Sequence, residues 1–304
     1  SSFSWCCSRS PSARATSGRG PASRVAKRSM PRSAICSGVR NVASLPRPLP
    51  VWVILGPPGS GKGTYASALA PKFGLDHFST GDLARHAMQK PEYEALRQLM
   101  ERGQLLPNSV ILALLKQRLE AVPASAKAVL LDGFPRTREQ AEMLESICSV
   151  SMALQIILKD EHILAKIAGR RTCSSCNRGY NVVNVSDQED DVFMPPILPK
   201  NVESLPSTAC GSSISFSQDK NLRCDCGSIL TKRADDSVEV AAERLRQHHQ
   251  EAGSVLSHYA SKGVLLQHRV RRGVGDMDGL ADRISSQLAM ACPRMQPGVC
   301  VSRL

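Results

Sequence analysis

The chain has 304 residues, enough to bury a full hydrophobic core, and a formal net charge of +12, which raises nucleic acid as a partner. However, eight arginines, one lysine and no acidic residue lie in residues 1–50, so the remaining chain is close to charge balance. Only 4% of the residues are aromatic, which argues against base stacking on nucleic acid. Because no apolar run approaches the roughly 20 residues that cross a bilayer, we also expect no membrane partner.

Residues 1–48 are predicted to be a targeting segment outside the folded part. They are rich in Ser, Arg, Ala and Pro and lack acidic residues, which is the composition of an organelle transit peptide. They have no apolar core of the kind that a secretory signal needs. The composition predicts import into a plastid or a mitochondrion, and the Ser, Ala and Pro content favours the plastid. The alternative is a disordered basic arm that stays on the mature protein.

Residues 51–64 hold the most informative pattern. Val51–Leu55 is a short apolar run of the kind that a buried parallel strand needs, and 64–73 has a helical pattern. The loop between them contains Gly56, Gly59, Gly61 and Gly63, whose missing side chains let backbone N–H groups close around an anion. Lys62 adds a cation that can reach phosphates. The usual pattern has Ser or Thr directly after the lysine, whereas here Gly63 stands between Lys62 and Thr64. This order predicts a nucleotide-phosphate site at a helix N-terminus.

The rest of the chain alternates short apolar strands with helices. Strands are expected at 51–56, 76–79, 127–131, 154–158 and 264–269. Helices are expected at 64–73, 80–89, 92–102, 108–121, 137–147, 160–169 and 237–261, with a last helix near Leu288. The alternation predicts an α/β fold built on a five-stranded parallel sheet with flanking helices, which binds ligands at the carboxyl ends of its strands.

Three segments downstream of the glycine loop narrow the assignment. They are Ser79–Arg85, Leu130–Arg136 with Gln140, and Gly169–Arg171 with residues 233–236 and Arg244. In this order, and together with the glycine loop, they resemble the adenylate kinases, which interconvert ATP plus AMP with two ADP. The resemblance runs from about Val51 to the last helix and indicates an organellar, plant- or algal-like member of the long-lid type.

The resemblance implies a domain arrangement. A kinase domain at 49–290 would contain a small helical AMP-binding flap at 79–108 and a β-rich lid at 170–233. A C-terminal tail would occupy 291–304. The resemblance further implies a monomer whose partners are the small-molecule nucleotides ATP, AMP and ADP, with Mg²⁺ accompanying ATP.

The resemblance also implies the site residues. ATP would be bound by Gly59, Ser60, Gly61, Lys62, Gly63, Thr64 and Arg170. AMP would be bound by Thr80, Arg85, Gln104, Leu105, Leu106, Gly133, Phe134, Pro135, Arg136, Gln140, Arg233 and Arg244. The catalytic cations would be Lys62, Arg136, Arg170, Arg233 and Arg244, and Thr64 and Asp132 would lie near Mg²⁺, Asp132 through ordered waters. Since the acceptor is already an anionic phosphate oxygen, positioning and charge neutralisation replace a strong general base.

Two features depart from the family pattern. Many members have an arginine that stacks on the ATP base four residues before Arg170, whereas this chain has Lys166, which lacks a flat surface. The preference between ATP and GTP as donor therefore stays open. We assign Gly273–Gly275 to the donor-base region, beside the unusual cluster of Arg269, Arg271 and Arg272.

The lid region contains five cysteines and an insertion. Cys173 and Cys176 have the two-residue spacer of a zinc ribbon, whereas Cys224 and Cys226 are separated by one residue, and Cys210 is a substitute ligand. We predict a structural Zn²⁺ site; the alternatives are a metal-free lid with reduced thiols and a redox-sensitive pair. The insertion, residues 186–221, is predicted to be a flexible surface excursion because of its acidic and proline residues.

Several other functions remain to be weighed. A UMP/CMP kinase on the same fold is disfavoured by Thr80 and by the long lid. A GTP–AMP kinase stays open because of Lys166. A non-catalytic nucleotide sensor is disfavoured because the lysine and all the arginines are present. A zinc-ribbon nucleic-acid binder is disfavoured by the near-neutral body of the chain.

Overall fold

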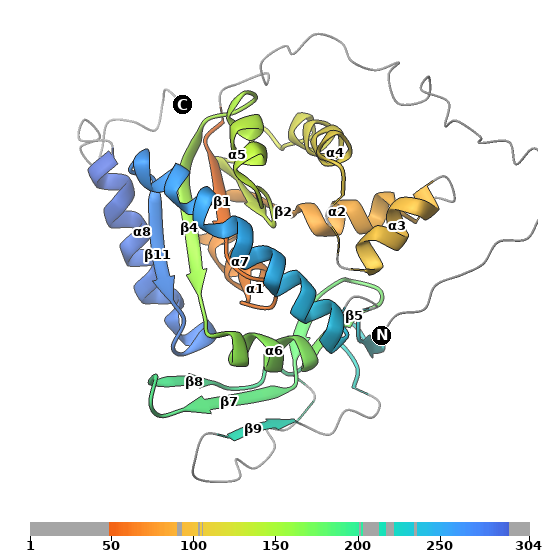
Figure 1. Ribbon diagram of the computed structural model, residues 1–304. Helices are drawn as coiled ribbons and strands as arrows, with labels where there is room; N and C mark the ends of the chain where they lie inside the picture. The colour runs from red at the N-terminus through yellow and green to blue at the C-terminus, as the bar shows by residue number, and fades with distance from the viewer. Residues whose placement is uncertain are drawn as a thin grey trace, which may run out of the picture. The chain divides into compact units, whose positions relative to one another are not determined.

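Figure 1 shows the computed structural model of the chain, which describes residues 49–89, 93–102, 104, 106–200, 202, 213–216, 222–233 and 236–291. The main sheet has five parallel strands in the order β11–β4–β1–β3–β2. These strands are β1 (Val51–Leu55), β2 (Leu75–Ser79), β3 (Ala128–Asp132), β4 (Val150–Ile157) and β11 (Leu265–Arg269). The predicted α/β fold with a five-stranded parallel sheet is confirmed.

Both faces of this sheet are covered by helices, which explains why its strands are apolar without alternation. Trp52 and Ile54 of β1 belong to one buried cluster, which also contains residues of α1 (Lys62–Phe73) and α8 (Met277–Ala291). Val51, Val53 and Leu55 belong to a second cluster, with residues of α4 (Asn108–Glu120), α5 (Arg138–Glu145) and α7 (Val238–Ser261). Successive residues of a strand point to opposite faces, so a strand buried on both faces needs apolar residues throughout.

Side-chain caps fix where three of the helices begin. Ser79 Oγ accepts a hydrogen bond from Asp82 N at the start of α2 (Thr80–Ala87). Thr137 caps α5 in the same way, and Ser237 caps α7. Such caps satisfy N–H groups that have no partner inside the helix. The Ser79 cap also starts α2 immediately after β2, so the first turn of α2 lies at the carboxyl edge of the sheet. The remaining helices are α3 (Glu94–Glu101), α6 (Asp160–Ala168) and the short η2 (Gly273–Asp276).

The lid region contains two small antiparallel sheets. The first has the order β10–β5–β6, from β5 (Arg170–Cys173), β6 (Gly179–Asn181) and β10 (Leu230–Thr231). The second has the order β8–β7–β9, from β7 (Val183–Asp187), β8 (Val192–Met194) and β9 (Ser213–Phe216). A β-rich region is therefore present where the sequence predicted one.

The insertion differs from its predicted flexible form over its first part. Residues of β7 and β8, among them Val185 and Met194, are buried in the same cluster as Ile54 of the main sheet. Asp187, within the acidic run, accepts a hydrogen bond from His162 of α6, whose Nε2 lies 3.0 Å from Asp187 Oδ2. The run is thus docked on the body through contacts distant in sequence. Residues 203–212 and 217–221 of the insertion lie outside the described part.

The two predicted tails lie outside the described residues, apart from the end of α8. That helix ends at Ala291, beside the expected domain boundary at 290, and the boundary stays a prediction. Within the described ranges, no helix is both long and apolar enough to cross a membrane.

Candidate active site

A cavity of about 800 Å³ lies at the carboxyl ends of the central strands. Leu55 at the end of β1 and Asp132 at the end of β3 line it, together with residues of the glycine loop, the lid and α7. Parallel α/β sheets bind their ligands at this edge, because the strands present loops and helix N-termini there. The sequence placed the site at the same edge.

The glycine loop joins β1 to α1 in close contact with its surroundings. A Cβ on Gly59, whose φ is +84°, would lie 2.5 Å from Ile167 Cγ1 of α6. Gly61 precedes α1 in a left-handed conformation with φ of 89°, which glycine adopts without strain. Ser60 Oγ is buried and has no hydrogen-bond partner among the described residues, so it can bind a ligand. Residues 59–64, which the sequence assigned to ATP, all line the cavity.

Lys62 is held at the mouth of this loop. Its Nζ donates to Gly56 O at 2.9 Å and to Pro57 O at 2.7 Å. Burial lowers the pKa of Lys62 to about 8; Asp132 opposes this shift, and the guanidinium groups of Arg136, Arg170 and Arg244 add to it. Because these cations line the same cavity, a polyanion bound there would be stabilised.

The five predicted arginines converge on the cavity from separate elements. All of them line it: Arg85 of α2, Arg136 after β3, Arg170 of β5, Arg233 after β10, and Arg244 of α7. Side-chain bonds orient two of these arginines, since Arg136 Nε donates to Gly133 O at 2.9 Å and Arg170 Nη1 donates to Asp236 Oδ1 at 3.0 Å. The guanidinium plane can then offer its other N–H groups to phosphate oxygens in pairs.

An ion-pair contact joins the flap to the lid across this cavity. Asp82 of α2 forms an ion pair with Arg85, and Arg233 Nη2 lies 3.9 Å from Asp82 Oδ1. Burial by itself would raise the pKa of Asp82, but Arg85 and Arg233 outweigh it and hold the pKa below its usual value. Asp82 therefore stays ionised and keeps both arginines near the cavity.

A second, smaller cavity of about 50 Å³ lies under the flap. Most of the residues predicted to bind AMP line it: Thr80, Arg85, Gln104, Leu106, Gly133, Phe134, Arg136, Gln140 and Arg244. Thr80 Oγ1 donates to Asp132 O at 3.1 Å, and Gln140 Oε1 accepts from Arg136 N at 2.8 Å. Pro135 and Arg233 line the larger cavity instead, and Leu105 lies outside the described residues.

Asp132 and Thr64 offer oxygen ligands beside the loop. Asp132 is only 9% exposed, and a Cβ on Gly63 would lie 3.3 Å from its Oδ2. Glycine at position 63 therefore leaves room between the loop and the carboxylate. A hydroxyl and a carboxylate are ligand types that suit Mg²⁺, so the residues present fit this ion.

The sequence did not single out His248 and Arg178, which also line the cavity. His248 lies four residues after Arg244 on α7, so the helical spacing alone could have placed it on the same face. Burial lowers the pKa of His248 to about 4, helped by Lys62 and His249, so its imidazole is neutral at pH 7. Arg178 follows the first cysteine pair, and no motif marks it.

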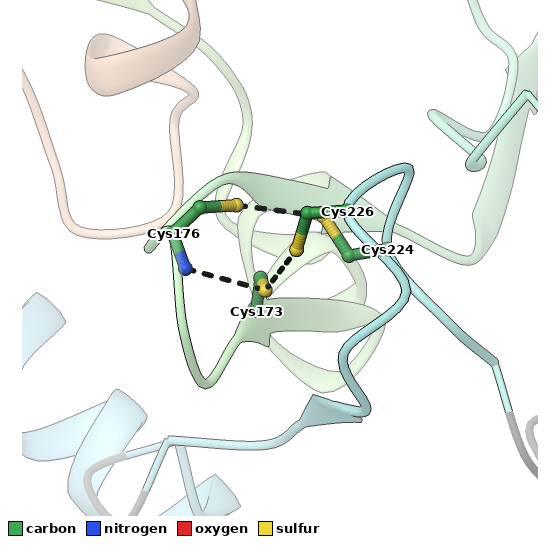
Figure 2. A group of neighbouring side chains, drawn as sticks. All are labelled: Cys173, Cys176, Cys224 and Cys226. Carbon is green, nitrogen blue, oxygen red and sulfur yellow. Dashed lines mark hydrogen bonds between the residues drawn. The ribbon is translucent and has the colours of Figure 1, made fainter.

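The four predicted cysteine ligands form one cluster at the end of the lid. Cys173 at the end of β5 and Cys176 in the turn that follows approach Cys224 and Cys226 from the turn before β10, as Figure 2 shows. All four sulfur atoms lie within 4.8 Å of one another, and the Cys173–Cys226 and Cys176–Cys224 sulfur pairs are each 3.5 Å apart. A tetrahedral Zn²⁺ with Zn–S bonds of about 2.3 Å requires sulfurs of comparable separation. Cys210, the substitute ligand, lies outside the described residues.

Comparison with known proteins gives a consistent result. The family model described as adenylate kinase matches residues 54–264. A probable adenylate kinase 6, chloroplastic, of Arabidopsis thaliana is 36% identical over 230 residues, which cover 73% of this chain and 70% of that protein. Adenylate kinase 1, chloroplastic, of the same plant is 34% identical and covers 73% of each chain. An adenylate kinase of Methanothrix thermoacetophila is 33% identical over 245 residues, covering 78% of this chain and 97% of that protein.

Proposed function

This chain belongs to the adenylate kinase family, and we propose that the cavity between the glycine loop, the flap and the lid is where it transfers a phosphoryl group from ATP to AMP, forming two ADP. The observation that carries the proposal is the convergence of Lys62 with arginines from the flap, the lid and α7 on one cavity. Cations gathered in one partly buried space repel one another, and a bound polyanion such as a nucleotide phosphate relieves that repulsion.

The glycine loop is proposed to bind the donor phosphates. Its backbone N–H groups lie at the start of α1, where unpaired donors and the helix dipole favour an anion. Lys62 now donates to two neutral carbonyls, and phosphate oxygens are stronger acceptors for an ammonium group. Ser60 Oγ, buried without a partner among the described residues, adds one more donor.

The smaller cavity is proposed to hold the AMP base, with the AMP phosphate directed toward the larger one. Arg85, Arg136 and Arg244 line both cavities, so they lie where the two nucleotides would meet. Thr80 and Gln140 are buried and line the smaller cavity together with the apolar residues Leu106 and Phe134. The apolar side chains can contact the faces of an aromatic base, and the polar side chains can bind its edge.

In the transfer step, an anionic oxygen of the AMP phosphate attacks the γ-phosphorus, and the bond from that phosphorus to the β–γ bridging oxygen breaks. No proton must be removed, so no general base is required. Arg170 and Arg233, at the two ends of the lid, and Arg136 are proposed to neutralise charge on the transferring group. In related phosphoryl transfers one such arginine contributes on the order of 10³–10⁵ in rate.

Family members use ATP together with Mg²⁺, and the residues beside the loop fit this ion. Thr64 and Asp132 would hold it, Asp132 through ordered waters. When bound, Mg²⁺ would supply positive charge to the donor phosphates. The same carboxylate is placed near Lys62, whose protonated form it favours.

A nucleotide panel tests the function. Initial velocities would be measured with AMP, CMP, UMP and dTMP as acceptors and with ATP and GTP as donors, in the presence of Mg²⁺. We expect AMP to be the preferred acceptor by a wide margin. A folded protein that makes no ADP from ATP and AMP would overturn the proposal, and a preference for UMP or CMP would reassign the acceptor.

We further propose that the four lid cysteines hold a structural Zn²⁺. Hydrogen bonds from Ser228 to Cys226 lower the pKa of this thiol to about 6, which favours the thiolate that zinc requires. The metal would order the lid and take no part in the chemistry. Metal analysis of the purified protein should give about one zinc per chain; less than a tenth of an equivalent would reject the site.

We also propose the finer assignments of domain and compartment. Residues 1–48 would be a transit peptide for a plastid, since the Arabidopsis relatives named above are described as chloroplastic. The flap at 79–108 and the lid at 170–233 would be the mobile parts, and the enzyme would act as a monomer. Import of the full chain into isolated chloroplasts and mitochondria, compared side by side, tests the compartment.

A further inference from the structure

The hairpin of β7 and β8, residues 183–194, is bound to the body of the kinase as well as to the lid. Its strands pair antiparallel with Val185 opposite Met194. Val185 and Met194 are 1% and 3% exposed and belong to the core cluster that contains Val270, at the end of β11. Phe193 lies between the buried positions and is 48% exposed. One face of the hairpin therefore packs on the body, and the other faces solvent.

The tip of the hairpin is fastened to the loop after β11. Phe193 N donates to Arg271 O at 2.7 Å, which joins the two main chains. Arg271 Nη1 donates to Asp191 Oδ2 at 2.9 Å, and Arg272 Nη1 donates to Asp191 O at 2.6 Å. Exposed ion pairs are weak one by one, but here two of them act beside a main-chain bond at the same turn. The hairpin is thus held against the residues that lead into η2.

The fastened loop is in turn connected to the phosphate-binding helix. Tyr65 of α1 donates its hydroxyl to Gly273 O at 2.9 Å. Met194 packs on the other side of this glycine, since a Cβ on Gly273 would lie 3.5 Å from Met194 Cγ. Tyr65 therefore connects the helix that follows the glycine loop to η2, and η2 in turn contacts the hairpin. Figure 1 shows β7 and β8 running beside α6; β7 contacts α6, and β8 contacts η2.

This end of the large cavity has a group of apolar residues beside Arg272. Leu158, Met194, Pro195, Val270, Gly273 and Val274 all line it. A donor nucleotide whose phosphates lie on the glycine loop would extend toward the connected η2 segment, and its base needs a flat, apolar contact. Lys166 also lines the cavity, but its side chain has no planar surface on which a base could stack.

We propose that Met194, presented by the β7–β8 hairpin, forms the wall of the donor-base pocket and determines which donor bases are accepted. The proposal rests on the phosphoryl-transfer function proposed above. A thioether side chain is polarizable and adapts to an aromatic face, so it suits a purine. An apolar wall discriminates between bases by their size and contacts few of their hydrogen-bonding groups. It should therefore separate purine from pyrimidine donors more strongly than ATP from GTP.

The test is a comparison of Met194→Ala with Phe193→Ala, the neighbouring residue whose side chain faces solvent. Met194→Ala should raise KM for ATP roughly tenfold and reduce the preference for ATP over CTP by a similar factor. Its kcat and its KM for AMP should change less than twofold, because a lost base contact acts on donor binding alone. Phe193→Ala should leave all of these constants within twofold of the unchanged protein.

A second variant decides the question if Met194→Ala does not fold. Asp191 has φ of 53°, so Asp191→Gly keeps the left-handed turn while it removes both carboxylate contacts with the arginines. We expect KM for ATP to rise about threefold, with an unchanged KM for AMP. An active parent protein whose folded variants keep KM for ATP within twofold would overturn this inference alone. A folded parent that converts no ATP and AMP would overturn the proposed function instead.

Discussion

The body around the main sheet and the lid are stabilised by different means. The body buries apolar side chains on both faces of the sheet, with Ile54 and Leu131 fully inaccessible. The part of the lid beyond β5 has a small core of Cys173, Tyr180, Cys224 and Leu230, in which two of the four buried residues are cysteines. A metal at these cysteines, as proposed above, would add to the stability that so small an apolar cluster can provide.

This difference separates two functions within one site. Lys62 and the glycine loop belong to the body, so their positions follow from the central sheet. Arg170 and Arg233 flank the lid, and their positions depend on the order of the strands between them. Phosphate binding should therefore survive when the lid is disturbed, whereas closure over the transferring group should not.

The largest effect is expected from the substitution Lys62→Met, which changes the body. Loss of the only cation on the glycine loop should lower kcat by about 10³-fold, because charge on the transferring group is no longer neutralised. The melting temperature should change little, since the buried ammonium of Lys62 has a pKa that burial lowers to about 8 and contributes no stabilising ion pair. A coupled assay and a thermal melt followed by circular dichroism provide both readouts.

Lys72→Met is the matched control for this variant. Lys72 lies on the same helix, is half-exposed, and forms an ion pair with Asp278. Its substitution should leave kcat within twofold. A kcat for Lys62→Met within tenfold of the parent value would contradict the role assigned to this lysine.

The body was more predictable from sequence than the lid for a physical reason. Thr80 and Asp132 lie at the ends of short strands, and Lys62 follows β1 after the glycine loop. Parallel neighbours bring strand ends to one edge of the sheet, whatever the conformation of the loops. The partners of the acidic run are remote: Asp187 lies 3.0 Å from His162, and Asp191 binds Arg271. Such pairs leave no local pattern, so the run was interpreted as a flexible excursion. The alternation of Val183, Val185, Val192 and Met194 is the local pattern from which a hairpin could have been predicted.

The second effect concerns the lid, in Cys224→Ser. Loss of one of four sulfur ligands should lower zinc affinity about 10²-fold or more, since even residues around a metal site change affinity by that factor. The main melting transition should stay in place, because the sheet and its two clusters are not altered. Zinc content by metal analysis and differential scanning calorimetry measure the two effects separately. Cys148→Ser, outside the cluster, is the control; a full equivalent of zinc retained by Cys224→Ser would count against the site.

The third effect is a pH dependence of ATP affinity, which we assign to Lys62 in the body. Lys62 is cationic below its pKa of about 8, so ATP binding there requires no proton uptake. Above this pH the lysine is neutral and must gain a proton when phosphate binds, because the phosphate raises its pKa. Affinity for ATP should therefore be constant below pH 8 and should fall about tenfold by pH 9.

Lys166 must be separated from Lys62 in this experiment, because burial lowers its pKa to about 8 as well. Isothermal titration of Mg·ATP into the Lys166→Met variant across pH 7–9.5 should keep the same profile. A profile that becomes flat in this variant would assign the titration to Lys166 instead of Lys62.

The smallest expected effects come from removing one tyrosine hydroxyl in the body and one in the lid. In the body, Tyr65→Phe removes the donor to Gly273 O at 2.9 Å. It removes a partly buried hydrogen bond, which should cost about 1 kcal/mol and lower the melting temperature by about 2–4 °C. In the lid, Tyr180→Phe removes a hydroxyl that lies 3.2 Å from Cys224 Sγ. This change should weaken zinc binding severalfold and leave the main transition unchanged, because Tyr180 packs in the small lid cluster and in neither core cluster of the body. Equal shifts of one melting transition in both variants would show that the lid and the body unfold as a single unit.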